Sequence, residues 1–123
     1  MPASAARSRW SFAREAESKA NLRTFGRDDL PFYDFAEADF IVSFGTDFLE
    51  TWGASVEHAR GFAASHGFAD GRMAKFTYVA PRASLTGLNA DEWLNVAPGS
   101  EAALALALAN LVAQQRGVAD AAL

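Results

Sequence analysis

The chain has 123 residues, of which 50% are apolar, and a formal net charge of −4 from 11 basic and 15 acidic residues. This length and composition suit one globular domain with a buried core, and the interspersed charges lack the basic stripe that nucleic-acid binding requires. The absence of cysteine excludes disulfides, thiolate nucleophiles, thiolate zinc sites and iron–sulfur ligation within this chain.

Residues 1–33 are predicted to be an N-terminal lead followed by one helix. Small and polar residues precede a helix expected over Trp10–Phe25, which Gly26 would end. The arginines near the start are not followed by a long apolar run, so a secretory signal is not expected. The segment Arg27–Tyr33 contains two adjacent aspartates and Pro31, which predict a loop with solvated charges.

A strand, a turn and a helix are predicted next. Phe40–Phe44 is rich in β-branched and aromatic residues and ends at Gly45, as a buried strand would. Asp47 has Glu50 three residues after it, the spacing of a capping box, which predicts that Asp47 caps a helical turn. The helix expected over Ser55–His66 would have Gly67 at its C′ position.

The second half of the chain adds two strands and a helix. Phe76–Ala80 is predicted to be a strand that Pro81 closes, Trp93–Ala97 a third short strand, and Ala102–Gln115 a helix buried on more than one side. Strand, helix and strand at this spacing form a right-handed βαβ unit with parallel strands. We therefore expect an α/β, three-layer, Rossmann-like domain with a short parallel sheet over residues 34–117, followed by a tail at 118–123.

Loops that follow parallel strands meet at one edge of the sheet, where ligands bind. Gly45 and Gly99 would place backbone N–H groups there, which suits phosphate, although glycines end strands in many α/β domains. Arg82 suits contact with a base or phosphate as well as it suits a surface salt bridge. The Asp47 carboxylate would repel a diphosphate and is expected to serve as a cap instead.

Other chemistry is not supported. The chain has neither the dinucleotide-binding glycine pattern nor a Walker loop. His58 and His66 would lie two helical turns apart, about 12 Å, so they cannot share a metal ion. Ser43 lacks the flanking glycines of a nucleophile elbow, and the adjacent residues Asp91 and Glu92 do not form an acid–base pair. No catalytic or metal-binding residue is predicted.

Three segments in order resemble molybdopterin oxidoreductases of the dimethyl-sulfoxide-reductase superfamily. They are residues 38–45, residues 79–82 with Thr86, and residues 94–104, so the resemblance covers about residues 34–113. In that family this region holds the guanine-nucleotide tail of the molybdopterin cofactor in strand-end loops. The resemblance implies that the matching, vestigial positions here are Gly45, Thr46, Asp47, Pro81, Arg82, Thr86, Gly99, Ser100 and Glu101.

Two departures from the family pattern favour loss of the cofactor. Cofactor-binding members carry a small residue and asparagine where this chain has Thr46 and Asp47, and an acidic residue where it has Ala80. The run from Phe44 to Trp52 resembles most closely the large iron–sulfur subunit of alternative complex III, whose molybdopterin-enzyme-like half lacks the cofactor. The resemblance therefore implies no cofactor in this chain, with molybdopterin guanine dinucleotide belonging to active relatives and iron–sulfur clusters to a missing part of the parent.

The function implied by the resemblance is structural. We expect part of a larger subunit that belongs to a quinol-oxidising respiratory complex, with the remainder of the parent and other subunits as partners. The parent is expected at the periplasmic side of a bacterial inner membrane, without direct insertion of this chain. Two alternatives stay open: a fragment of an active enzyme that binds the cofactor's nucleotide tail through Gly45, Arg82 and Gly99, or a free-standing nucleotide-binding or interaction module.

Overall fold

The computed structural model describes residues 11–69 and 71–117, so the expected lead at 1–9, Trp10 and the tail at 118–123 lie outside the described residues. The chain divides into two compact units, residues 1–33 and 34–123. Within the part described, no helix has the length and apolar character needed to cross a membrane.

The first unit contains helix α1, Ser11–Phe25, which ends at Gly26 with a positive φ of 71° as expected. The charges that follow the helix are not simply solvated. Asn21 is buried and donates to the Asp29 carboxylate (2.7 Å), while the Tyr33 hydroxyl donates to Glu17 (3.1 Å). These contacts hold the segment after Gly26 against the helix, and burial followed by the Glu17 contact raises the pKa of Tyr33 to about 12.

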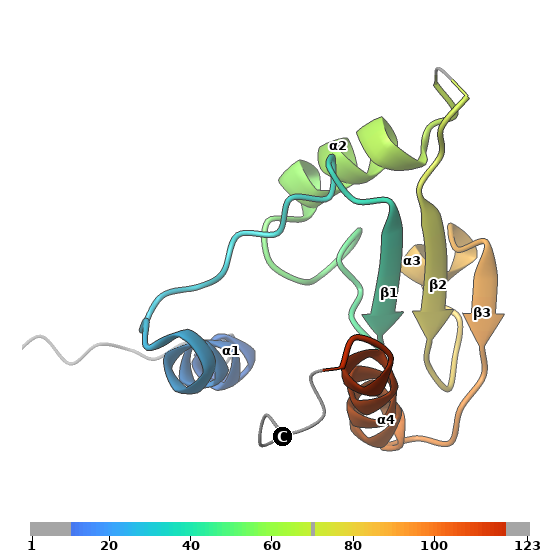
Figure 1. Ribbon diagram of the computed structural model, residues 1–123. Coiled ribbons are helices and arrows are strands. Elements are labelled where there is room, and N and C mark those ends of the chain that lie inside the picture. The colour runs from blue at the N-terminus through green and yellow to red at the C-terminus, as the bar shows by residue number, and fades with distance from the viewer. Residues whose placement is uncertain (1–10, 70, 118–123) are drawn as a thin grey trace, which may run out of the picture. The chain divides into compact units, whose positions relative to one another are not determined.

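The second unit is an α/β domain around a three-stranded parallel sheet, as predicted (Figure 1). The strands are β1, Phe40–Phe44, β2, Lys75–Val79, and β3, Glu92–Leu94, in that spatial order. β2 pairs in parallel with both neighbours, with Val42 opposite Thr77 and Tyr78 opposite Trp93. The strands predicted at 40–44 and 76–80 therefore lie side by side and parallel.

Three helices connect or follow the strands. Helix α2, Ser55–His66, links β1 to β2, a short helix α3, Leu85–Leu88, links β2 to β3, and α4, Glu101–Gln115, follows β3. Right-handed crossovers in a sheet of this order place α2 and α3 over the same face. α4 begins at the carboxyl ends of the strands and contacts β1 (Figure 1).

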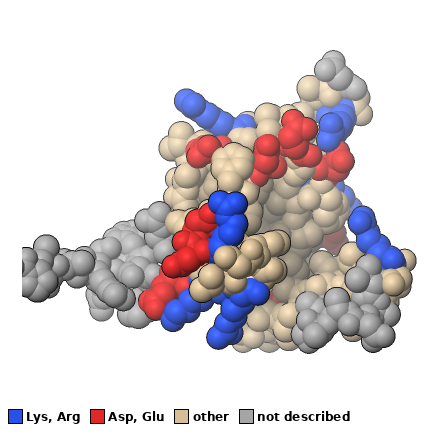
Figure 2. All heavy atoms as spheres, turned by 60° about the vertical axis from the view of Figure 1, so that its left-hand side comes forward, with Lys and Arg blue, Asp and Glu red and all other residues tan. Residues whose placement is uncertain are grey.

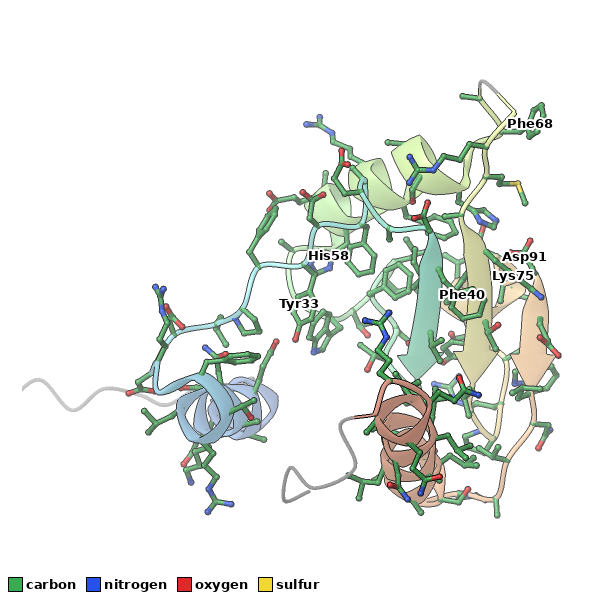
Figure 3. All side chains as sticks on the ribbon, in the orientation of Figure 1. Tyr33, Phe40, His58, Phe68, Lys75 and Asp91 are labelled. Atoms are coloured by element: carbon green, nitrogen blue, oxygen red, sulfur yellow. The ribbon has the colours of Figure 1, made fainter. Side chains whose placement is uncertain are left out.

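The core lies on the face of the sheet that α2 and α3 cover, where aromatic rings from β2, α2 and the turn after β1 meet. Phe76 is fully buried, with its ring centroid 5.4 Å from Phe48 and 5.5 Å from Phe62. Ile41, Tyr78 and Ala80 complete the buried cluster. The opposite face is less covered, because Phe40 is 55% exposed there (Figure 3). The period of two along β1 thus separates a packed face from a partly open one, whereas the central strand β2 is buried from Phe76 to Val79.

The third strand is shorter than predicted. Trp93–Ala97 was the expected range, whereas β3 ends at Leu94 because its neighbour β2 stops at Val79, just before Pro81. Only three residue pairs form between β2 and β3, and one further hydrogen bond joins the Ala80 amide to the Leu94 carbonyl (3.2 Å). An edge strand extends only as far as its neighbour offers hydrogen-bonding groups.

Gly67 ends α2 in a different conformation from the one expected. A left-handed C′ glycine was predicted, but Gly67 has φ −65° and ψ 128°, and its N–H donates to the Ala63 carbonyl. A Cβ at this position would lie 2.6 Å from the Ala63 oxygen. Glycine is therefore needed for close approach of the backbone, not for a left-handed turn.

Candidate functional site

The three loops predicted to form a site do follow the carboxyl ends of the strands. Gly45 begins the first loop with φ 68°, and its amide donates to the Val79 carbonyl at the end of β2 (2.8 Å). A Cβ on Gly45 would lie 3.9 Å from the Glu101 carboxylate, so the start of α4 lies directly beside the first loop. The structure thus brings the first and third predicted loops together.

The first and second loops are joined through Asp47. The Tyr78 hydroxyl donates to Asp47 Oδ1 (2.7 Å), and the Ser84 hydroxyl donates to the same oxygen. Tyr78 is 2% exposed and Ser84 is 7% exposed. The Asp47 carboxylate therefore serves as an acceptor for two nearly buried hydroxyls from another part of the chain.

The capping box predicted for residues 47–50 was wrong. The Asp47 backbone carbonyl, not its side chain, closes the turn by accepting from the amides of residues 50–52 at 3.0 to 3.1 Å. The Glu50 carboxylate accepts from the Thr86 amide at the start of α3 (3.1 Å) instead of reaching back to Asp47. Both carboxylates have found tertiary partners, which compete with local capping.

Thr86 is a second junction between the same two loops. It is fully buried, and its hydroxyl oxygen accepts from the Leu49 amide (3.2 Å). Ser84 forms the N-cap of α3 by accepting from the Gly87 amide (3.2 Å). Gly87 permits the Tyr78 ring to lie close to α3, since a Cβ there would be 2.6 Å from the ring. The short helix α3, which the sequence did not predict, thus packs against Tyr78 and the first loop.

Burial has the largest effect on the pKa of Tyr78 at this junction. Desolvation raises the pKa of the Tyr78 hydroxyl, the Ser84 hydroxyl lowers it, and the Asp47 carboxylate raises it again. The positive charge of Arg82 acts on Tyr78 in the lowering direction, although the Arg82 side chain is itself exposed. A cation, two hydroxyls and a carboxylate therefore share this part of the carboxyl edge.

The third loop is organised by its own backbone. Gly99 has φ 84°, and a Cβ there would meet no heavy atom within 4 Å. The Ser100 amide and hydroxyl both donate to the Ala97 carbonyl (3.1 and 2.6 Å), so the Ser100 side chain does not cap α4. Glu101 begins the helix beside Gly45 and places a negative charge at its amino end.

The two histidines lie in separate environments. His66 Nδ1 is 2.8 Å from the Ala74 carbonyl, and its Nε2 is 3.8 Å from Asp91, which is labelled at the start of β3 in Figure 3. His58 is buried against Trp52, with ring centroids 5.4 Å apart. Among residues 11–69 and 71–117, no three metal-ligating side chains gather as a metal ion would need.

The surface carries side chains of both charges. On the face drawn in Figure 2, acidic side chains gather in the upper part of the view, with basic side chains to either side of them. Asp91 is used within the protein, because its carboxylate accepts from the Phe76 amide (2.7 Å) and its own amide donates to Phe76. It therefore fixes the start of β2 and does not act in an acid–base pair with Glu92.

Comparison with known proteins gives the family. The sequence profile described as "Molybdopterin oxidoreductase" matches residues 5–123, nearly the whole chain. The chain belongs to the molybdopterin oxidoreductase family. The resemblance to this family, proposed from residues 34–113, is confirmed.

Two curated relatives indicate the kind of protein in which this domain occurs. The molybdopterin-binding-like subunit of menaquinone reductase from Nitratidesulfovibrio vulgaris is 39% identical over 80 residues, covering 65% of this chain and 12% of that protein. The molybdopterin-containing subunit ArrA of arsenate respiratory reductase from Shewanella is 34% identical over 89 residues, covering 64% of this chain and 9% of that protein. The chain therefore spans only about a tenth of each relative. No solved structure matches significantly.

Proposed function

We propose that this molybdopterin oxidoreductase domain is a structural part of a quinol-oxidising respiratory complex subunit, of the alternative complex III type, and holds no molybdenum cofactor. The observation that carries the proposal is the Asp47 carboxylate, which accepts hydrogen bonds from Tyr78 and Ser84 between the first two loops. A nucleotide diphosphate brought to this edge would meet that negative charge and those of Glu50 and Glu101.

The backbone of the first loop also supports the absence of a phosphate site. A phosphate-binding turn presents free N–H groups to its ligand. Here the amides of Gly45, Leu49 and the three residues that follow Leu49 donate to acceptors within the protein, which leaves fewer N–H groups of this segment to face a ligand. Together with the Asp47 carboxylate, this arrangement disfavours a cofactor phosphate at the first loop.

The structural role is supported by the apolar surface of α4. The helix has no charged side chain between Glu101 and Arg116. It was predicted to be buried on more than one side, but none of its residues is buried within this chain and its leucines are 41 to 60% exposed. A helix that is apolar on every side is normally buried, and contiguous exposed apolar surface marks an interaction site. The chain therefore suits a position inside a larger assembly, with the rest of a parent subunit and neighbouring subunits as partners.

The relatives support a respiratory setting. The relative at 39% identity is named as a menaquinone reductase subunit that is molybdopterin-binding-like. A periplasmic location of the parent in a bacterial inner-membrane complex follows as part of the same proposal. Iron–sulfur clusters would belong to other parts of the assembly, since this chain has no cysteine.

A second function has one observation in its favour. The relative at 34% identity is named as a molybdopterin-containing subunit, and Arg82 is an exposed cation beside the convergent loops. A cofactor-binding fragment of an active oxidoreductase would use Arg82 and the Gly99 loop to hold the nucleotide tail.

The metal and nucleotide content of the purified protein decides between these functions. The chain should be expressed together with the rest of the proposed parent subunit and its partner subunits, in a host that makes molybdopterin guanine dinucleotide. An oxidoreductase that contains the cofactor serves as the positive control. Inductively coupled plasma mass spectrometry should find no molybdenum, and acid extraction should release no guanine nucleotide. Stoichiometric molybdenum together with guanine nucleotide would refute the proposal.

A further inference from the structure

The two hydroxyls around Asp47 form a donor pair that meets at a single oxygen atom. Tyr78 contributes its hydroxyl from β2, and Ser84 contributes its own from the loop after β2. Both side chains are nearly buried, and the Gly87 amide donates to Ser84 Oγ, which leaves the Ser84 proton free to point at the carboxylate. The donors thus come from β2 and from the loop that follows it, while the acceptor comes from the first loop.

Such a donor pair has the chemistry of an anion site. Phosphate oxygens accept short hydrogen bonds from hydroxyl groups, as carboxylate oxygens do. The positive charge of Arg82 acts on Tyr78, so a cation is also within electrostatic reach. Asp47 Oδ1 occupies the point at which the two hydroxyl donors meet.

We propose that the Asp47 carboxylate is an internal anion that fills a phosphate-oxygen site formed by Tyr78 and Ser84 and thereby excludes phosphate-bearing ligands. The inference rests on the proposed function, in which these loops hold no nucleotide. It adds that Tyr78 and Ser84 still offer the hydrogen-bond donors of a phosphate site and that the Asp47 carboxylate occupies both donors.

The contacts also indicate that Asp47 can be truncated without loss of the fold. The Tyr78 and Ser84 hydroxyls are 3.1 Å apart and can bond to each other once the carboxylate is gone. The turn at residues 50–52 is closed by the Asp47 backbone carbonyl, which an alanine retains. Asp47→Ala therefore removes the internal anion while one hydroxyl proton becomes free for an external acceptor.

The experiment titrates inorganic phosphate into the full chain, followed by isothermal calorimetry and by ³¹P line broadening. Asp47→Ala should bind phosphate at least about tenfold more tightly than the unmodified chain, the factor for one charge-assisted hydrogen bond. Glu57→Ala is the matched control, because it removes one negative charge from an exposed position on α2. It should bind phosphate no better than the unmodified chain.

The triple variant Asp47→Ala/Tyr78→Phe/Ser84→Ala should lose the added phosphate affinity, since both hydroxyl donors are removed. If Asp47→Ala is folded and neither it nor the unmodified chain binds phosphate, the inference is overturned and the proposed function stands. Tight binding of phosphate at this edge by the unmodified chain would count against the proposed function itself. If both Asp47→Ala and the conservative Asp47→Asn lose folded structure by circular dichroism, Asp47 is a folding residue and the inference is overturned.

Discussion

Phe76 offers the most direct test of how the core is built. Its side chain is fully buried between Phe48 and Phe62, on the face of the sheet that α2 and α3 cover. Replacing a buried phenylalanine with alanine removes its transfer free energy and leaves a cavity, which costs about 3 to 5 kcal/mol. The total stability of a small domain is about 5 to 15 kcal/mol, and a short chain lies near the lower end.

Phe76→Ala is therefore expected to be largely unfolded at 37 °C, whereas Phe76→Leu, which keeps most of the volume, should lose less than about 1.5 kcal/mol. Urea unfolding followed by tryptophan fluorescence measures both at low temperature. Phe68→Ala is the matched control because that ring is 77% exposed, and it should change stability by less than about 0.5 kcal/mol. Equal losses at positions 76 and 68 would refute the assignment of the core.

The remaining predictions concern the loop junction and the tyrosines. Thr86→Val keeps the volume but leaves the Leu49 amide without its acceptor, so it should cost about 1 to 3 kcal/mol in urea unfolding, and Thr86→Ser should cost less. Gly87→Ala should cost about 1 to 3 kcal/mol in urea unfolding because its Cβ would lie 2.6 Å from the Tyr78 ring; an unchanged stability would contradict the close packing. The pKa values of Tyr33 and Tyr78 are raised above 10.0 in the folded state, so the folded chain retains protons that the unfolded chain loses, and stability should fall as pH rises from 10 towards 12. Tyrosinate absorbance at 295 nm should rise with a midpoint near 10 in urea and above 10 in buffer, and coincident midpoints would show that neither hydroxyl is shifted.

The sequence predicted most of the fold because its periodic segments are locally distinctive. β1 was found at Phe40–Phe44 and α2 at Ser55–His66 with the correct limits, since apolar period and flanking glycines agree there. β2 and α4 were each placed within one residue of their observed starts. The short helix α3 was missed because four residues that include a glycine give no helical period, and its cap depends on Ser84.

The meeting of the strand-end loops was predicted from the sequence, but the contacts between them were not. The convergence of the loops follows from parallel topology, which the strand–helix–strand pattern indicates. The role of Asp47 cannot be predicted from this topology, because its partners Tyr78 and Ser84 lie 31 and 37 residues away in the sequence. A carboxylate three residues before Glu50 looks like a local cap, and only the packed structure shows that it bridges two loops.

Titration of the unmodified full chain with GDP tests the central claim most directly, because GDP carries the guanine and diphosphate of the cofactor's nucleotide tail. Isothermal calorimetry to millimolar GDP should give only heats of dilution, since Asp47, Glu50 and Glu101 surround the edge where the diphosphate would lie. Saturable binding that Arg82→Ala abolishes would contradict the account.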